Sequence, residues 1–404
     1  MAPLGLGHQL LVLNAGSSSL KYAVFTAAQS ALKRVVHGIA EGIGTSTQAC
    51  FKHYGGTVET AKDVDLPDHR KALTLILNAF RTDRIAAVGH RVVHGGEKFS
   101  KAALVDDEVL REISAAASLA PMHNPWNLLG IEVSLEMIGK HPQVAVFDTA
   151  FHQTMPPQAY MYALPYSLYE NHSIRRYGFH GTSYRYVLGE TAKELGKSVD
   201  KTNLIVCHLG SGASMCAIKE GKCIDTTMGL TPLEGLVMGS RSGDIDPAVP
   251  LHLINQLGYS AEEVAHLLNK QSGLLGICGF PDNRDVEAGY HQQEPLALLA
   301  KKLQVYRTRK YLGAYLVALE GSVDALVFTG GIGENSHLHR RLVCEGLDKL
   351  GLQLDDSRNK LQDGRFASNT RLDTGAKHIQ IWVIPTDEEL SIAQQTAGVL
   401  ASMQ

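Results

Sequence analysis

The chain has 404 residues, more than one ordinary hydrophobic core holds, and this length predicts at least two domains. Hydrophobic residues make up 44% and charged residues 20%, a composition typical of a soluble globular protein rather than a disordered or fibrous one. The 38 Lys and Arg residues nearly balance the 41 Asp and Glu residues, so neither nucleic acid nor a membrane surface is an expected partner.

The cysteines and the apolar runs indicate the cellular compartment. The six cysteines are scattered without a C-x-x-C pair, and several lie in apolar runs, which predicts reduced buried thiols and a cytoplasmic location. No apolar run reaches the roughly 18 residues of a membrane span. The stretch Leu10–Leu13 stops at Asn14, so no secretory signal is expected.

Two similar strand–turn–strand patterns occur in the two halves of the chain. Leu10–Phe25 predicts a strand, a turn rich in Gly and Ser, and a returning strand. Leu204–Ile218 repeats this pattern, with Gly210 at the position equivalent to Gly16. Two copies of one hairpin favour a duplicated α/β fold with a ligand held between the halves.

The remaining strands are short apolar runs that end abruptly at polar or glycine residues. These runs are Ala86–Gly89, Val144–Phe147, Ala325–Phe328 and Ile379–Ile384. Ligands of open α/β sheets collect at the carboxyl ends of strands, where those polar residues would lie. Helices are predicted at Ala261–Leu268, Leu296–Leu319 and Glu388–Leu400. Because no Pro- and Ser-rich linker is present, the domains are expected to interleave, with the last helix returning to the first domain.

Three glycine-rich turns can offer consecutive backbone N–H groups to phosphate oxygens: Asn14–Lys21, His208–Ser214 and Gly330–Asn335. None has the Walker A spacing. In the first turn, Lys21 can supply a charge, and the turn's serines can supply hydroxyl donors. A single such turn is more often only a hairpin, but three after buried strands favour a phosphate site.

Two arginines are candidate anion ligands. Arg91 follows a predicted strand, and Arg241 lies among small residues that leave its guanidinium accessible. A guanidinium binds planar oxyanions with two hydrogen bonds, which suits a carboxylate or a transferring phosphoryl group. The alternative for each arginine is a surface salt bridge, the commoner fate of a lone Arg.

Acidic residues and one histidine complete the candidate chemistry. Asp148 ends a predicted strand, where it can act on a metal or substrate or simply cap a helix. His180 stands close to two glycines, which favours a donor to a developing anion over a packed core histidine. Glu388 and Glu389 can stabilise the first turn of the last helix, because negative charges favour the positive end of the helix dipole; alternatively, one of them can bind a magnesium ion.

A series of long motifs spanning residues 11 to 390 resembles the acetate kinase family. These motifs are Leu11–Tyr22, Gly89–Phe99, Ala120–Pro125, Val144–Met155, Arg176–Ser183, Thr226–Pro247, Ser272–Gly276, Val327–Ser336 and Ile384–Leu390. The resemblance implies the α/β fold shared by sugar kinases, actin and heat-shock chaperone ATPases, with two ribonuclease-H-like domains of duplicated topology flanking a nucleotide cleft. It also implies an N-terminal acetokinase domain (residues 1–150 plus 387–404) and a C-terminal nucleotide-binding domain (151–386).

The implied reaction is ATP plus acetate to ADP plus acetyl phosphate, reversible, by direct in-line transfer to the carboxylate. A kinase for propionate or another short-chain fatty acid is the alternative within the family, and an actin-like binding module is the alternative outside it. By resemblance, Arg91 binds the acetate carboxylate, Asp148 is catalytic, and His180 and Arg241 stabilise the transition state. Family members are usually homodimers.

The resemblance also assigns the binding residues. Mg²⁺, with Mn²⁺ as an alternative, is held by Asn14 and Glu388. The methyl group of acetate faces Val93, Met122, Phe179 and Pro232. The ATP site is formed by Ser17, Ser19, Lys21, His208, Leu209, Gly210, Ser211, Gly212, Asp282, Asn283, Arg284, Gly331, Ile332, Gly333, Glu334 and Asn335.

The sequence departs from the family pattern at a few positions. Ser211 stands where the family commonly has Asn, which removes one side-chain amide near the phosphates. Ser240 replaces Thr beside Arg241, and Asp387 replaces Asn before the two glutamates.

Overall fold

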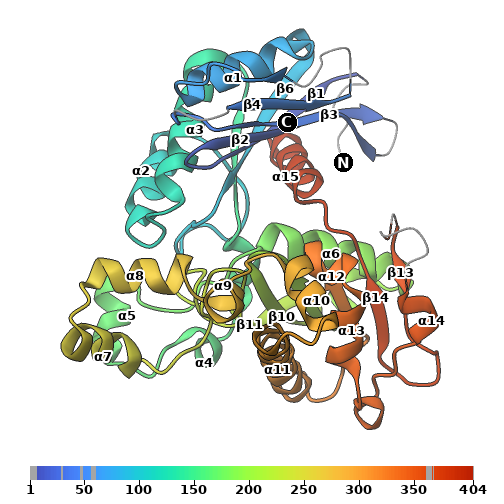
Figure 1. Ribbon diagram of the computed structural model, residues 1–404. Coiled ribbons are helices and arrows are strands. Elements are labelled where there is room, and N and C mark those ends of the chain that lie inside the picture. Colours follow the sequence, from blue (N-terminus) through green and yellow to red (C-terminus); the bar gives the residue numbers. More distant parts are fainter. Residues whose placement is uncertain are drawn as a thin grey trace. The chain divides into compact units, whose positions relative to one another are not determined.

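The computed structural model describes residues 7–28, 31–45, 49–55, 61–360, 366 and 368–403. The chain forms two compact units (Figure 1). Unit 1 comprises Met1–Phe151 and Asp387–Gln404, and unit 2 comprises His152–Thr386. Each unit consists of a mixed β-sheet with helices, so the expected α/β class is confirmed. In the part of the chain that the structure describes, every helix is too short or too polar to cross a membrane.

Unit 1 is built on an eight-stranded sheet with the order β5-β4-β3-β2-β1-β6-β8-β7 among the described residues. Its strands are β1 (Gln9–Ala15), β2 (Ser19–Ala28), β3 (Ala31–Glu41), β4 (Cys50–Tyr54), β5 (Ala61–Lys62), β6 (Ile85–Val92), β7 (Ala103–Leu104) and β8 (Gln143–Phe147). Its helices are α1 (His69–Asn78), α2 (Asp107–Ala115), α3 (Asn124–Ile138) and α15 (Glu388–Ser402).

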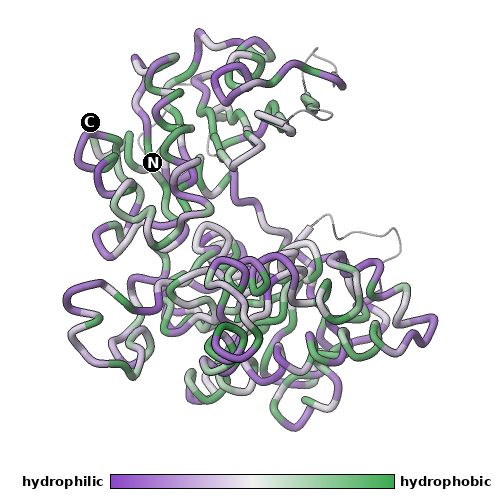
Figure 2. The backbone as a smooth tube through the Cα atoms, turned by 60° about the vertical axis from the view of Figure 1, so that its left-hand side comes forward, coloured by the Kyte–Doolittle hydropathy of each residue, from purple (hydrophilic) through white to green (hydrophobic). Residues whose placement is uncertain are grey.

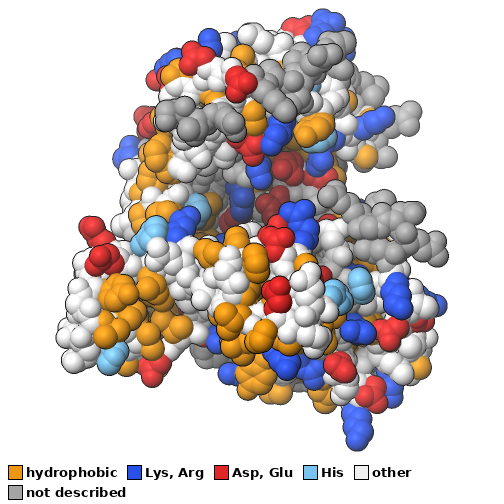
Figure 3. All heavy atoms as spheres, in the orientation of Figure 1, with side chains coloured by type: hydrophobic (Ala, Val, Ile, Leu, Met, Phe, Trp, Pro, Cys, Tyr) orange, Lys and Arg blue, Asp and Glu red, His pale blue; other side chains and the backbone are white. Residues whose placement is uncertain are grey.

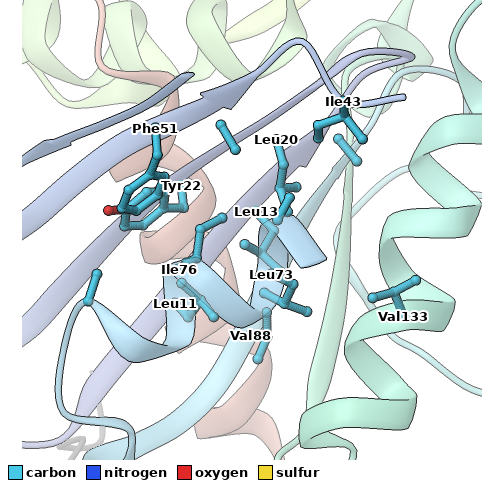
Figure 4. Packing of buried hydrophobic residues seen from close by; sticks show 14 of the residues in the cluster. Leu11, Leu13, Leu20, Tyr22, Ile43, Phe51, Leu73, Ile76, Val88 and Val133 are labelled. Carbon is cyan, nitrogen blue, oxygen red and sulfur yellow. The ribbon is translucent and has the colours of Figure 1, made fainter. Parts of the chain in front are cut away.

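Alternation along β1 gives the sheet two apolar faces. Leu11 and Leu13 pack in one buried cluster with Leu73 and Ile76 of α1 and with residues of α3, as Figure 4 shows. Leu10 and Val12 point to the other face, where they pack with apolar residues of α15. The central strands are therefore covered on both sides, which is why they read as uninterrupted apolar runs in the sequence.

Unit 2 is built on a six-stranded sheet with the order β11-β10-β9-β12-β14-β13 among the described residues. Its strands are β9 (Leu204–Leu209), β10 (Ala213–Lys219), β11 (Lys222–Thr226), β12 (Ala325–Thr329), β13 (Thr370–Arg371) and β14 (Gln380–Val383). Its helices are α4 (Pro157–Tyr160), α5 (Tyr166–His172), α6 (Gly181–Glu194), α7 (Ala248–Leu257), α8 (Ala261–Lys270), α9 (Gly273–Cys278), α10 (Asn283–His291), α11 (Pro295–Ala318), α12 (Gly330–Asn335), α13 (His337–Cys344) and α14 (Asp356–Asn359). Figure 2 shows hydrophobic segments alternating with hydrophilic turns in both units.

The two sheets share one topology. In unit 1, β3, β2 and β1 are antiparallel neighbours, and β6 and β8 continue parallel to β1. In unit 2, β11, β10 and β9 are antiparallel in the same way, and β12 and β14 continue parallel to β9. The duplication expected from the two Gly-Ser hairpins is therefore confirmed at the level of the whole sheet.

Two local expectations were wrong. Strand β6 continues to Val92 instead of ending at Gly89, so His90 and Arg91 lie within the strand. The sheet accommodates the buried His90 because its Nε2 lies 2.7 Å from Gln143 Oε1. The segment Gly330–Asn335 forms the short helix α12 rather than a turn. Gly330 allows this abrupt change of direction because its φ is +75°, and a Cβ there would lie 2.8 Å from the Leu209 carbonyl oxygen.

Candidate active site

In unit 1, Arg91 and Asp148 lie at the carboxyl ends of the neighbouring parallel strands β6 and β8. The Arg91 guanidinium donates to Asp148 Oδ2 from Nε at 3.1 Å and from Nη2 at 2.7 Å. The Asp148 side chain is only 1% exposed, and its backbone N–H donates to the Val92 carbonyl at 2.9 Å. One edge of the Arg91 fork is thus fixed by a buried carboxylate, which differs from the surface salt bridge considered as the alternative in the sequence analysis.

Glu388, the first residue of α15, lies on the other side of the same guanidinium. Its Oε2 is 3.7 Å from Arg91 Nη1. Burial raises the pKa of Glu388, while the charge of Arg91 opposes this rise. Burial also disfavours the charged form of Arg91, but the carboxylates of Asp148 and Glu388 outweigh it and raise the pKa of the guanidinium. This arginine therefore keeps its charge in a buried setting.

Asn14 and Lys21 lie directly opposite each other on β1 and β2, next to the turn that contains Ser17 and Ser19. The turn is closed by a hydrogen bond from Gly16 N–H to the Ser19 carbonyl at 2.8 Å. Ser17 and Lys21 are exposed, and neither the Asn14 carboxamide nor the Lys21 ammonium is bonded to a described residue. Amide and carboxylate oxygens are hard ligands, so the donors of Asn14 and Glu388 fit Mg²⁺ chemically.

Two asparagines of α3 support this edge of unit 1, and the sequence reading missed them. Asn127 accepts from Val93 N–H at 3.0 Å and donates to the Ala15 carbonyl at 2.8 Å. Asn124 accepts from His94 N–H at 3.0 Å and donates to the His94 carbonyl at 2.9 Å. Both asparagines are buried in α3, which begins inside the 120–125 motif, so two amides three residues apart in a largely apolar helix were the available signal.

Of the residues expected around the acetate methyl group, Val93 and Phe179 are buried, at 9% and 2% exposure. Pro232 is partly buried. Met122 is 56% exposed, so within unit 1 it does not belong to a packed apolar wall.

In unit 2, Arg241 and His180 converge over Gly212. A Cβ placed on Gly212 would lie 2.4 Å from Arg241 Nη2 and 3.6 Å from His180 Nε2. The absence of a side chain at this position is what allows the two donors to approach the turn between β9 and β10. The structure thus brings together three of the residues predicted from sequence.

His180 is held from several sides. It adopts a left-handed conformation, with φ of 59°, just before α6. Its Nδ1 lies 2.8 Å from Ser214 Oγ, and its ring stacks on His208 with 4.2 Å between centroids. Ser183 Oγ in turn lies 2.8 Å from His208 Nδ1. These contacts aim the Nε2 edge of His180 toward Arg241, and a non-glycine residue at positive φ signals a strained position with a specific role.

Arg241 is a partly buried cation without a carboxylate partner. Its Nη1 donates to the Pro232 carbonyl at 2.7 Å, and burial lowers the pKa of the guanidinium. Among the described residues, no Asp or Glu oxygen forms an ion pair with it. A guanidinium that is partly withdrawn from water and has no carboxylate partner gains from binding an anion.

A cavity of about 650 Å³ opens beside this convergence. Its lining contains eight of the expected nucleotide residues: Gly210, Ser211, Asp282, Asn283, Arg284, Gly331, Ile332 and Asn335. Three further residues in the lining, Pro281, Glu287 and Ser336, were missed. Because the cavity is bounded by the β9–β10 turn and by α12, it has the backbone donors that phosphate oxygens need.

Leu209, Gly333 and Glu334, which were also expected in the nucleotide site, lie outside the cavity lining. Leu209 is a core residue, 3% exposed, and Gly333 is buried, with the position of its missing Cβ 3.4 Å from the Cys207 carbonyl oxygen. Glu334 accepts from Gly330 N–H at 2.9 Å and from Thr386 N–H at 3.0 Å, so its carboxylate ties two loops together instead of lining the cavity.

A buried lysine supports the cavity wall. Lys301 of α11 is completely buried, and its ammonium donates to Glu287 at 2.8 Å and to Asn283 at 2.9 Å. Burial lowers the pKa of Lys301, and the charge of Glu287 opposes this shift. In the sequence, Lys301 stands beside Lys302 in a long helix, and no local pattern marks it as the buried one of the two.

Comparison with known proteins agrees with this arrangement. The sequence matches the acetokinase family over residues 9–394. The acetate kinase of Dictyoglomus thermophilum is 46% identical over 402 residues, which cover 97% of this chain and 99% of that protein. Porphyromonas gingivalis acetate kinase has a TM-score of 0.90 at 40% identity, covering 97% and 100% of the two chains. A Francisella tularensis propionate kinase has a TM-score of 0.88 at 42% identity, covering 96% and 98%. The resemblance expected from the sequence motifs is confirmed: the chain belongs to the acetokinase family.

Proposed function

We propose that the protein is an acetate kinase, which transfers the γ-phosphoryl group of ATP to acetate and gives ADP and acetyl phosphate. The observation that carries this proposal is the convergence of His180 and the carboxylate-free Arg241 over Gly212, beside the 650 Å³ cavity. A nucleotide-binding module needs neither donor, whereas phosphoryl transfer needs charge neutralisation at the transferred group. Family membership supplies the acceptor class.

The chemistry requires little acid–base catalysis. Acetate is already a carboxylate at neutral pH, so the main barrier is repulsion between two anions and their in-line placement. We propose that Arg91 binds the acetate carboxylate and that His180 and Arg241 neutralise the transferring phosphoryl group. Asp148 then acts as the residue that orients Arg91, since its oxygen is occupied by two guanidinium hydrogen bonds.

The domain assignment and the metal belong to the same proposal. Unit 1 corresponds to the acetokinase domain and unit 2 to the nucleotide-binding domain. Asn14 and Glu388 supply the oxygen ligands for Mg²⁺. Ser17, Ser19 and Lys21, which follow Asn14 in the chain, donate hydrogen bonds to the phosphate oxygens. When bound, Mg²⁺ would offset the negative charge of the nucleotide phosphates.

A cytoplasmic homodimer is the proposed state of the protein. Hydrophobic side chains gather on the surface of unit 2 over α7 and α8, as Figure 3 shows. Three of them, Val249, Leu251 and Leu257, belong to α7 and are 42–59% exposed. Such a patch is typical of an association surface. Light scattering after size-exclusion chromatography, on the unmodified protein and on Leu251→Lys, would test it.

A hydroxamate assay for acyl phosphate tests the function. Purified protein is given ATP, Mg²⁺ and a series of short-chain acids, and ADP formation is followed in parallel. Acetate-dependent formation of both products supports the proposal. Better use of propionate would move the assignment to a propionate kinase, and ATP hydrolysis unaffected by any acid would reject a carboxylate kinase. Leu296→Ala, an exposed position on α11 away from the cavity lining, is a matched control for preparation effects.

A further inference from the structure

A histidine and two cysteines lie together in the core of unit 2, and the proposed reaction uses none of them. His152, Cys216 and Cys223 are all completely buried. Cys216 Sγ is 3.4 Å from Cys223 Sγ, and His152 Nδ1 is 3.1 Å from Cys223 Sγ. All three donor atoms lie within 4.8 Å of one another. We propose that His152, Cys216 and Cys223 form a binding site for a thiophilic d¹⁰ metal ion such as Zn²⁺.

The histidine has the orientation that a metal ligand needs. His152 Nε2 lies 2.8 Å from the Phe179 carbonyl oxygen, an acceptor that requires the ring proton on Nε2. Nδ1 is then the nitrogen with a lone pair, and it faces the sulfur of Cys223. A second-shell carbonyl that fixes the tautomer in this way is a regular feature of metal-bound histidine. The ring is confined further, because a Cβ on Gly178 would lie 2.8 Å from it.

The sulfur geometry favours a shared ion over a disulfide. On the antiparallel strands, Cys216 pairs with Thr226 while Cys223 pairs with Ile218, so the cysteines are diagonal neighbours at a bulge. A disulfide would require their sulfurs to approach to about 2.05 Å, which diagonal positions oppose. Two thiolates bound to one Zn²⁺ ion lie about 3.8–4.0 Å apart, since each Zn–S bond is about 2.3 Å and the S–Zn–S angle is about 110–120°. The observed 3.4 Å needs only a small expansion to reach that distance.

The charges also balance. Two thiolates and one neutral imidazole would neutralise a divalent ion in a site without solvent. Among the described residues no fourth His, Cys, Asp or Glu joins the group. Sulfur donors select soft ions, so millimolar Mg²⁺ should not compete.

The site would lie directly beneath a proposed catalytic residue. The Phe179 carbonyl that contacts His152 immediately precedes His180. On the other side, Cys216 follows Ser214 by two positions on β10, and Ser214 Oγ contacts His180 Nδ1. A bound ion would therefore restrict the motion of the Phe179 backbone and of Ser214 on β10, and so hold the His180 ring in place.

The experiment uses the complete protein, reduced and freed of metal by a chelator, and titrates it with Cd²⁺ in the presence of Mg²⁺. Thiolate-to-metal charge-transfer absorption should rise to an end point of one Cd²⁺ per chain, and excess Zn²⁺ added beforehand should slow its rise by competing for the same site. Cys216→Ser and Cys223→Ser should each lose this end point. Cys207→Ser is the matched control and should keep it, because Cys207 is equally buried in the same sheet but pairs with Met215 and so points to the opposite face.

A measurement on the unmodified protein keeps the test decisive if either cysteine variant fails to fold. X-ray absorption of the zinc-loaded protein should show two sulfur scatterers at about 2.3 Å and an imidazole nitrogen at about 2.0 Å. Absence of charge-transfer absorption, an unchanged end point in both cysteine variants, or a zinc shell made only of nitrogen and oxygen would each overturn the proposal. A Cys216–Cys223 disulfide that forms under air while no metal is taken up would overturn it as well.

Discussion

The guanidinium of Arg91 donates two hydrogen bonds to one carboxylate oxygen of Asp148, so this arginine is oriented by a buried partner before any substrate arrives. The same pairing makes Arg91 a structural as well as a functional residue, and the two contributions can be separated experimentally.

Arg91→Ala should lower kcat/KM for acetate by more than 100-fold, since a lost charged donor at the reacting group costs about 3 kcal/mol. It should also lower the free energy of unfolding by about 3 kcal/mol, because the buried Asp148 carboxylate would lose the compensating charge of Arg91. In the double variant Arg91→Ala/Asp148→Ala, urea denaturation should show recovered stability while activity stays low. Near-normal turnover in folded Arg91→Ala would remove this residue from the mechanism.

Gly212→Ala should disable the enzyme without unfolding it. The new methyl group would meet Arg241 Nη2 at 2.4 Å and displace the guanidinium. A displacement of about 1 Å at such a group can reduce turnover by about 100-fold, so kcat should approach that of Arg241→Ala. Gly189→Ala in α6 is the matched control, because its added Cβ would meet nothing within 4 Å. Equal activity of the two alanine variants would contradict the proposed role of the convergence over Gly212.

Gly331→Leu should raise the KM for ATP by about ten-fold or more and affect the KM for acetate less. Gly331 lines the cavity, and nothing lies within 4 Å of the position of its missing Cβ, so a larger side chain would occupy space rather than disturb the fold. Steady-state kinetics with each substrate varied would measure this. More efficient use of pyrophosphate than of ATP by the unmodified protein would show that the cavity does not hold an adenine nucleotide.

Acetate should be preferred over propionate by roughly ten-fold in kcat/KM, because one methylene in an apolar pocket is worth about 1–3 kcal/mol. Val93 is proposed to limit the pocket: it is buried, its branched side chain is stiff, and its N–H is fixed by Asn127. Val93→Ala should shrink or invert the preference. Competition between the two acids is the measurement, and an unchanged ratio would place the discrimination elsewhere.

Asp373→Asn should destabilise unit 2 in a manner that depends on pH. Burial opposes ionisation of Asp373, but hydrogen bonds from Arg371, Ile381 N–H and Gly375 N–H outweigh it and lower its pKa below 3.8. A lowered pKa in the folded state gives stability that is present above pH 3.8 and is lost as the pH falls through the folded value. Urea unfolding of variant and parent should therefore differ by about 2 kcal/mol at pH 7 and converge in acid. A difference that persists unchanged at low pH would contradict this origin.

Much of the fold could be predicted from sequence because its signals are local. The strands around Leu11, Val206 and Val327 are uninterrupted apolar runs, and the Gly-Ser turns mark their ends, so the duplicated hairpins were visible. The end of β6 could not be predicted in this way, because His90 and Arg91 are polar. A strand is favourable there only because Gln143 and Asp148 provide hydrogen-bonding partners.

In the candidate site, too, local motifs could be predicted from the sequence, whereas contacts between distant residues could not. Family motifs indicated Arg241, His180 and Gly212, but their convergence depends on how α6 and the β9–β10 turn pack. Partners that are distant in the sequence, such as Lys301 for Glu287 or Asn127 for Val93, carry no local pattern that identifies them. A polar residue on an apolar helix face predicts that a partner exists, without saying which one.

The position of α15 has a consequence for the order of assembly during synthesis. The ribosome releases β1 first and α15 last, yet Leu10 and Val12 share one buried cluster with Ile392 and Ala393. Unit 2 is a single continuous segment whose sheet is complete before α15 emerges. We therefore expect unit 2 to fold on the nascent chain while the face of β1 that α15 later covers is still exposed. The nascent chain should be most prone to aggregation during that interval.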